Sequence, residues 1–102
     1  MEVHVNELRQ AVERMHQRTA WLTEALPVSE TFQGQPVWQG IVHIFELTGH
    51  HAATCCYAWS SPMEGSDKRR FFAVLHIPPI TSTQDAVRAA IVQEYRTDNP
   101  FS

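Results

Sequence analysis

The residues of this chain that are best suited to chemistry are its six histidines and two cysteines. A zinc site needs three or four such ligands at suitable spacing, often as Cys-x-x-Cys or as histidines one helical turn apart. Cys55 and Cys56 are instead direct neighbours, and no expected helix carries a His-x3-His pair. The four scattered glycines form no phosphate-binding loop. The sequence therefore predicts neither a metal site nor a cofactor.

Cys55 and His43 could in principle form a thiolate–imidazole pair. Their expected mid-strand positions are poor places for a nucleophile, which usually lies on a loop or at a helix N-terminus, so no catalytic residue is predicted. The adjacent cysteine Cα atoms lie about 3.8 Å apart, too close for the roughly 4.4–6.8 Å of a relaxed disulfide. Free thiols, together with the lack of a signal-like or membrane-spanning run, indicate a cytoplasmic protein.

One long amphipathic helix is expected from Asn6 to about Leu26, where Pro27 would end it. Its apolar positions are spaced alternately three and four residues apart. They are Val5, Leu8, Val12, Met15, Thr19, Leu22 and Leu26. The same spacing also satisfies a short heptad seam, so the helix could cover a sheet or pair with another helix.

A β-hairpin is expected between Val37 and Trp59, with its corner at Thr48–Gly49. Because β-branched Thr48 does not suit a positive φ, a type I turn followed by a left-handed Gly49 fits best. In that register the opposing pairs are Glu46 and His50, His43 and Ala53, and Ile41 and Cys55. One face would then carry Gln39, Ile41, His43, Phe45, His51, Ala53, Cys55, Tyr57 and Trp59. That face is too apolar for solvent and too polar for an ordinary core.

A third strand is expected from about Arg70 to Ile77, ended by Pro78-Pro79. Ser82 and Asp85 then resemble a capping box that opens a last helix. The apolar face of that helix would be Ala86, Val87, Ala90, Ile91 and Tyr95. The resulting order is α-β-β-β-α in a single α+β domain, residues 1–102. We expect a three-stranded antiparallel meander with both helices packed on one face.

The second sheet face would need a partner, because large exposed apolar patches usually mark interaction surfaces. The simplest partner is a second copy of the chain. The first hypothesis is therefore a non-enzymatic interaction module, a homodimer that pairs through Ile41, Phe45 and Trp59. The second is a small-molecule-binding protein or weak enzyme, with a pocket between the sheet and the first helix. Its polar groups would be His43, Cys55 and Tyr57.

An RNA-binding domain is the third hypothesis, because double-stranded-RNA-binding domains share the α-β-β-β-α order. The formal net charge of −3 and the pI near 6.0 oppose it. The only basic run is Lys68–Arg70, and the last helix opens with Asp85 rather than with basic residues. Nucleic acid is therefore an unlikely partner, and a membrane is not expected.

Two runs of this sequence resemble a known group of proteins. They are Val-Trp-Gln-Gly-Ile-Val-His-Ile-Phe-Glu-Leu-Thr-Gly-His and Tyr-Ala-Trp-Ser-Ser-Pro-Met-Glu-Gly-Ser-Asp-Lys-Arg-Arg-Phe-Phe-Ala-Val-Leu-His. Across roughly residues 36 to 95 the chain resembles small uncharacterised bacterial proteins, some of which are carried as mobile gene cassettes of integrons. The resemblance implies no activity and no site residue.

Overall fold

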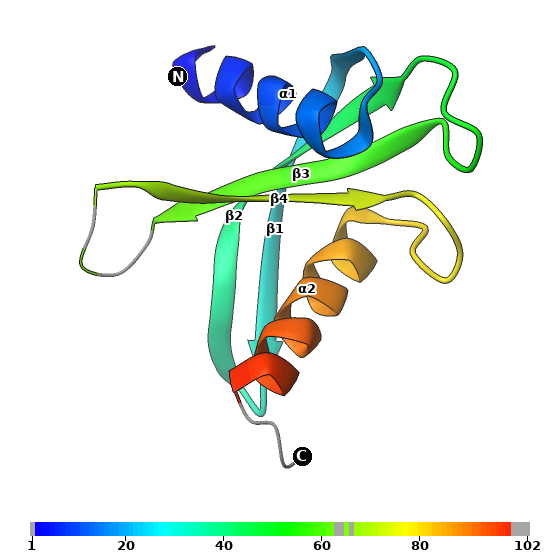
Figure 1. The fold of residues 1–102 in the computed structure, drawn as a ribbon. Helices are drawn as coiled ribbons and strands as arrows, with labels where there is room; N and C mark the ends of the chain where they lie inside the picture. The colour runs from blue at the N-terminus through cyan, green and yellow to red at the C-terminus, as the bar shows by residue number, and fades with distance from the viewer. Residues whose placement is uncertain (1, 63–64, 66, 99–102) are drawn as a thin grey trace.

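The computed structural model describes residues 2–62, 65 and 67–98, which form one four-stranded antiparallel sheet and two helices (Figure 1). In chain order the elements are α1 (Glu2–His16), β1 (Ala20–Phe32), β2 (Gln35–Leu47), β3 (Cys55–Pro62), β4 (Arg69–Leu75) and α2 (Thr83–Asp98). The strands lie in sequence order, so β1 and β4 are the edges of the sheet. The predicted α+β class and antiparallel sheet are confirmed. The predicted number of strands is wrong, because there are four.

The expected helix over residues 6–26 is two elements in the structure. Helix α1 ends at His16, and Gln17 takes a positive φ of 56° that turns the chain back. The carboxylate of Glu13 accepts a hydrogen bond from the backbone N–H of Ala20 at 2.8 Å, which fixes this reversal. Residues 20–32 then pair with β2 along its whole length. The hydrogen bonds of that ladder and the burial of Ala20 and Val28 outweigh the helical spacing.

The expected register of the central hairpin is also wrong. Strands β2 and β3 pair through His43 with Ala58, Ile44 with Tyr57, Phe45 with Cys56 and Glu46 with Cys55. This is five positions from the expected pairing of His43 with Ala53, and an odd shift exchanges the faces of one strand relative to the other.

Local hydrogen bonds in the loop before β3 account for the shift. Residues 48–54 form a loop closed by a 2.8 Å hydrogen bond from Leu47 N–H to the Thr54 carbonyl. Within it, His50 Nδ1 accepts the backbone N–H groups of Ala52 and Ala53 at 3.1 and 3.2 Å. Gly49 has the expected positive φ, at 69°.

The two helices cover opposite faces of the sheet, which corrects the expectation that both pack on one face. The α1 face carries Phe45, Cys56 and Ala58, packed with two residues of α1, Leu8 and Val12. The α2 face is lined by Val42, Tyr57 and Trp59, which pack with the α2 residues Ala86 and Val87. Because side chains alternate along a strand, β3 supplies both cores from successive residues. Figure 1 shows β3 and β4 crossing between the two helices.

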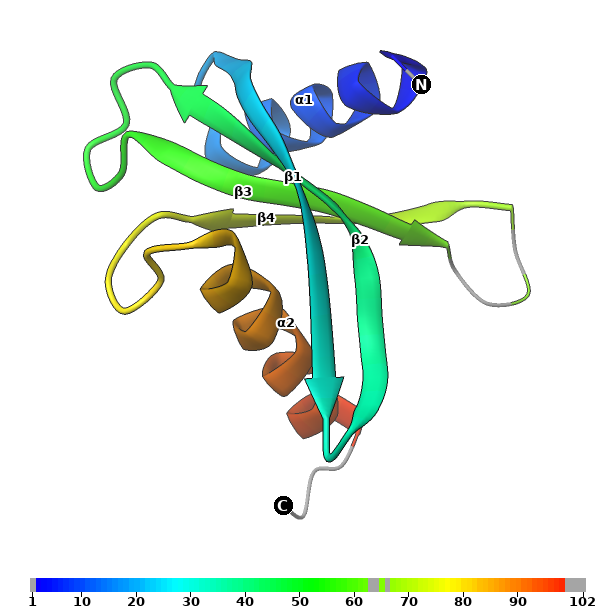
Figure 2. The ribbon, with the colours of Figure 1, turned by 180° about the vertical axis from the view of Figure 1, so that it is seen from behind.

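The β1–β2 hairpin extends well beyond the rest of the sheet. Strand β2 pairs with β3 only over residues 43–46. In contrast, the pairing of β1 with β2 begins at Ala20 and Leu47 and continues to the turn at Gln33–Gly34. Figure 2 shows this arm from behind, with α2 lying against its far side. One face of the arm therefore packs on α2, and neither α1 nor α2 covers the other.

The expected cap at the start of α2 is formed, with its return hydrogen bond to Thr81 rather than to Ser82. The Asp85 backbone N–H donates to Ser82 Oγ at 3.1 Å, and the Asp85 carboxylate accepts the backbone N–H of Thr81 at 3.1 Å. The hydrogen bond from the Thr81 backbone holds the pKa of Asp85 below its usual value. Four residues of the expected apolar face pack on the sheet. They are Ala86, Val87, Ala90 and Ile91. The side chain of Tyr95 lies outside the described part of the chain.

Candidate functional site

The three expected ligand-binding residues do not share one face of the sheet. His43 lies on the α1 face beside Ala58, whereas Cys55 and Tyr57 lie on the α2 face. His43 is half-buried, its Nδ1 has no hydrogen-bond partner among the described residues, and burial lowers its pKa. The expected pocket between the sheet and the first helix, with all three side chains in it, is therefore not formed.

The structure places His76, rather than His43, beside Cys55 and Tyr57. The Tyr57 hydroxyl lies 2.5 Å from His76 Nδ1, and the backbone N–H of His76 donates to the Cys55 carbonyl at 3.0 Å. In the β3–β4 register Cys56 faces Leu75, so Cys55 and His76 stand opposite each other just beyond the ladder. The sequence placed His76 in its third predicted strand. Bringing His76 beside Cys55 required the correct register between that strand and β3.

The acid–base properties of this Cys55–Tyr57–His76 cluster do not suit nucleophilic catalysis. Burial raises the pKa of the Cys55 thiol above its ordinary value, with a smaller contribution from Glu46. A nucleophilic cysteine needs a lowered pKa, since the thiolate is the reactive form. Burial likewise raises the pKa of Tyr57. Cys56 is fully buried, and burial raises its pKa to about 12. Both cysteines are free, as expected.

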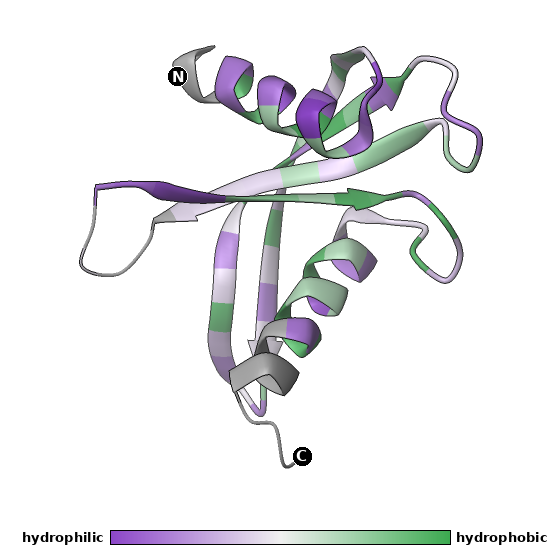
Figure 3. Ribbon diagram, viewed as in Figure 1, coloured by the Kyte–Doolittle hydropathy of each residue, from purple (hydrophilic) through white to green (hydrophobic). Residues whose placement is uncertain are grey.

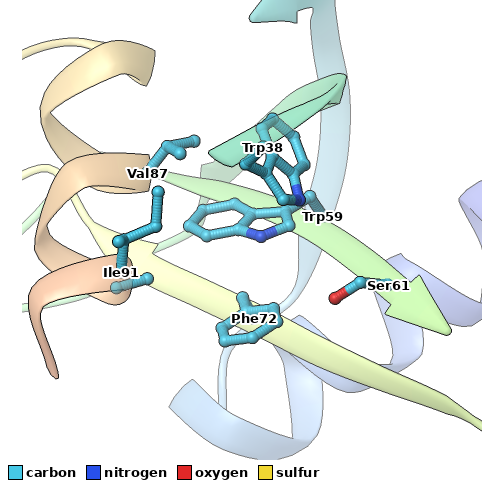
Figure 4. Close-up of a pocket in the computed structure, with 7 residues that line it drawn as sticks. Trp38, Trp59, Ser61, Phe72, Val87 and Ile91 are labelled. Atoms are coloured by element: carbon cyan, nitrogen blue, oxygen red, sulfur yellow. The ribbon is translucent and has the colours of Figure 1, made fainter. Parts of the chain in front are cut away.

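A small aromatic cavity lies on the α2 face (Figure 4). Trp59 stacks on Phe72 with ring centroids 5.1 Å apart, and Trp38 meets Trp59 edge-on at 6.0 Å. Val87 and Ile91 of α2 close the cavity, whose volume is about 30 Å³. That is space for one or two water molecules and far below the roughly 300–1,000 Å³ of a ligand pocket. These aromatic residues therefore form a core between sheet and helix.

The three expected dimer residues are separated as well. Phe45 is completely buried under α1, and Trp59 is 3% exposed under α2. Only Ile41 is accessible, with 48% of its surface exposed. Ile41 does share the side of the sheet with Phe45, but it lies on the part of β2 that pairs with β1 and not with β3. The fold therefore does not bring the three residues together on one exposed surface.

The free side of the arm carries exposed apolar side chains on which neither α1 nor α2 packs. We call it the outer hairpin face. It is made of Ala25, Pro27, Ser29, Val37, Gln39 and Ile41, all exposed. On the opposite side of the same strands, Val28 and Val42 are buried against α2. This alternation places Ala25, Pro27, Ser29, Gln39 and Ile41 on one face of the paired strands, whereas Val37 lies at the register shift near the turn of the arm.

A buried carboxylate fixes the arm to α2. Glu30 on β1 is only 9% exposed, and it accepts hydrogen bonds from Arg88 Nε at 2.9 Å and from the Gln84 side chain. Gln84 also donates to the Ser29 carbonyl at 2.9 Å. Residues 29 and 30 belong to β1, a strand that the sequence did not predict, so sequence reasoning missed this contact. The available signal was an acidic residue alternating with Val28 in a β-branched stretch.

The Glu30 contact makes stability dependent on pH. The hydrogen bond from Arg88 is the main reason why the pKa of Glu30 lies below its usual 4.5. The Glu30 carboxylate therefore becomes protonated at a higher pH in the unfolded chain than in the folded chain. The stabilisation is complete above pH 4.5 and is lost as the pH falls through the lowered folded value. Urea unfolding measures the free energy of unfolding at pH 7 and at pH 3. Between these two pH values it should decrease less in Glu30→Gln than in the wild type.

Glu24→Gln is the matched control for that experiment, because Glu24 lies on the same strand but is exposed. It should retain the wild-type pH dependence. An unchanged dependence in Glu30→Gln would show that the Arg88 contact does not stabilise the fold.

Comparisons with protein-family models, curated proteins and solved structures found no match to this chain. Among the described residues, no group of three or more histidine, cysteine or acidic side chains is placed to hold a metal ion. In that same part of the chain, no helix is long and apolar enough to cross a membrane.

Proposed function

We propose that this protein is a non-enzymatic interaction module whose partner is a second copy of the chain, bound through the outer hairpin face. The observation that carries the proposal is the exposure of Ile41, at 48%, on the paired part of the arm, and of Val37, at 47%, at the register shift near its turn, on the side where neither α1 nor α2 packs. Exposed apolar side chains gathered on one regular face are typical of interaction surfaces.

The composition of the outer hairpin face favours a second copy over another partner. The face carries apolar and neutral polar side chains and no charged one. A two-fold interface brings each patch against itself, so a charged residue close to the two-fold axis would meet its own copy. An uncharged face avoids that repulsion, whereas recognition of a different protein commonly uses complementary charges.

Pairing face to face is favoured over pairing edge to edge. Strand β1 is a sheet edge, and Pro27 near its middle offers no N–H group to an added strand. A register shift between Leu22 and Glu24 further interrupts this edge, where Thr23 Oγ1 donates to the Ile44 carbonyl at 3.0 Å. Such interruptions are the usual devices that prevent edge association.

The size of the face indicates a weak dimer. Eight residues of β-strand span about 25 Å, and two strands with their side chains are about 10 Å wide. The resulting area is well below the roughly 800 Å² that each partner contributes to a stable interface. We therefore expect an equilibrium between monomer and dimer rather than a permanent assembly.

Sedimentation velocity over a concentration series tests this proposal. The wild type should sediment at the 11.7 kDa of one chain when dilute and should shift toward twice that mass as its concentration rises. Ile41→Glu should remain monomeric throughout, because two-fold pairing would bury two carboxylates against each other. A wild type that stays monomeric at the highest concentration contradicts the proposal.

Val92→Glu is the matched control, because Val92 on α2 is also 48% exposed but lies outside the outer hairpin face. It should associate like the wild type. If Val92→Glu lost association and Ile41→Glu did not, the interface would lie on α2 and the proposal would be wrong.

A further inference from the structure

The loop of residues 48–54, which connects β2 to β3, is folded around one histidine side chain. His50 Nδ1 accepts the backbone N–H groups of Ala52 and Ala53 at 3.1 and 3.2 Å. A ring nitrogen accepts hydrogen bonds only while it carries no proton, so these contacts require the neutral imidazole with its proton on Nε2. The conformation of the loop therefore depends on the charge state of His50.

The 48–54 loop is also joined to the end of α1 and to the residues that follow it. Arg18 Nε donates to the Gly49 carbonyl at 3.2 Å. The ring of His16, the last residue of α1, meets the ring of His50 edge-on, with centroids 6.1 Å apart. Figure 3 shows that the last turn of α1 and part of the loop are both hydrophilic. The contact between them is therefore made by polar groups and not by an apolar core.

Three ionisable groups next to His50 are cations or become cations in acid. His51 of the same loop stacks on His50 with ring centroids 4.8 Å apart. His16 approaches from α1, and Arg18 approaches from the connection between α1 and β1. Desolvation of the ring, followed by the influence of His51, His16 and Arg18, lowers the pKa of His50 below its ordinary 6.5. Acid would thus bring like charges together at this point.

Two carboxylates on the adjoining elements have other partners. Glu13, one turn before the end of α1, accepts the backbone N–H of Ala20 at 2.8 Å. Glu46 near the end of β2 is exposed, and it acts on the Cys55 thiol. Neither carboxylate is among the groups that shift the pKa of His50.

His16 responds to acid differently from His50. Its Nε2 lies 3.3 Å from the Ala73 carbonyl oxygen on β4. Because a carbonyl oxygen can only accept, His16 Nε2 carries a proton and donates it in the neutral ring as well as in the charged one. Acid leaves this hydrogen bond intact, so His50 is the member of the cluster whose hydrogen bonds depend on pH.

We propose that the 48–54 loop is a pH-sensitive element that opens when His50 takes up a proton from the solvent. Protonation turns Nδ1 into a donor that faces two other donors, so both of its hydrogen bonds are lost. The charged ring leaves the stack with His51, and the loop separates from the end of α1. Ala53, which is 6% exposed in the closed loop, then becomes accessible. The loop lies at the opposite end of β2 from the outer hairpin face, so this inference does not rest on dimer formation.

The direction of the pH dependence follows from linkage. In the open loop the pKa of His50 returns to its ordinary 6.5, whereas it is lower in the closed loop. The closed loop is therefore fully favoured above pH 6.5 and becomes less favoured as the pH falls below that value. Each further pH unit weakens the closed form about tenfold relative to the open form, as long as His50 stays neutral in the closed form.

Amide hydrogen exchange of the full chain, followed by NMR between pH 7.5 and pH 5, tests this proposal. The protection factor of the Ala53 amide should fall about tenfold for each pH unit once His50 begins to titrate. That of Ala58, which is fully buried on β3 between two paired strands, should not change. A constant protection factor at Ala53 overturns the proposal. An equal fall at Ala58 would indicate global unfolding and would also overturn it.

His50→Asn separates the acceptor from the charge. An asparagine oxygen can accept the N–H groups two and three residues ahead, as it does in turns and at helix N-termini, but it does not titrate. The Ala53 protection factor of this variant should therefore be the same at pH 7.5 and at pH 5. A fall equal to that of the wild type would assign the transition to another group and overturn the proposal.

His51→Asn is the matched control, because it removes the stacked ring and leaves His50 with both of its hydrogen bonds. The Ala53 protection factor of this variant should still fall in acid. If the transition disappeared in His51→Asn and persisted in His50→Asn, the responsible proton would be on His51 and the proposal would be wrong.

Discussion

Replacing Trp59 with alanine should lower the free energy of unfolding by about 3–5 kcal/mol, the range typical of large aromatic truncations in cores. Trp59 is 3% exposed and fills the space between β3 and α2. It also makes two ring contacts, stacking on Phe72 and meeting Trp38 edge-on. Its removal would leave a cavity at the centre of the α2 core. Urea unfolding followed by far-UV circular dichroism measures the loss.

Trp21→Ala provides a control of identical chemistry. Trp21 lies on β1 with 46% of its surface exposed, so its truncation removes much less buried area. The loss should be less than half of that caused by Trp59→Ala. Equal losses would mean that α2 does not cover Trp59 as described.

Replacing Phe45 with alanine should lower the free energy of unfolding by a similar amount, about 3–5 kcal/mol, because it leaves a cavity in the core on the other side of the sheet. Phe45 is fully buried and packs with Leu8 and Val12 of α1. Total stabilities of domains are about 5–15 kcal/mol, so either substitution removes a large share. The same urea titration measures it.

Phe32→Ala is the control for Phe45→Ala. Phe32 lies near the turn of the arm and is 65% exposed, so its loss should change the unfolding free energy only slightly. Large losses in both Phe45→Ala and Trp59→Ala are the result expected of two cores, one on each face of the sheet. If Phe45→Ala were as mild as Phe32→Ala, α1 would not pack on this face.

The sequence was informative where local rules decide the structure. Gly49 adopts the left-handed conformation that its place after Thr48 demanded. The capping box of Ser82 and Asp85 opens α2 as expected. In both places the geometry depends on residues within a few positions of one another, so no knowledge of distant partners was needed.

The sequence misled where pairing between distant segments decides. Leu22 and Leu26 continue the apolar spacing of α1, yet they lie on β1 because residues 20–32 pair with β2. That strand was then missing from the expected sheet. The loop at residues 48–54 was also read as part of a strand, which moved the register of the hairpin by an odd number of residues. Because of these two errors, both helices were assigned to one face of the sheet.

The candidate sites show the same limit. Cys55 and Tyr57 were correctly placed on one face, because they are two residues apart on β3. His43 was assigned to them by the wrong register, and His76 takes its place through the pairing of β3 with β4. All three predicted interface residues were expected to be accessible, and Ile41 is. Phe45 and Trp59 are buried under α1 and α2, and the positions of these helices could be located only from the fold.

The central claim is that two copies of this chain meet through the outer hairpin face. The most direct measurement is an isotope-filtered NMR experiment on an equal mixture of labelled and unlabelled protein at a concentration that favours the dimer. Intermolecular contacts should involve the methyl groups of Val37 and Ile41. Contacts that instead involve Val92 on α2, or the absence of any intermolecular contact, would contradict the claim.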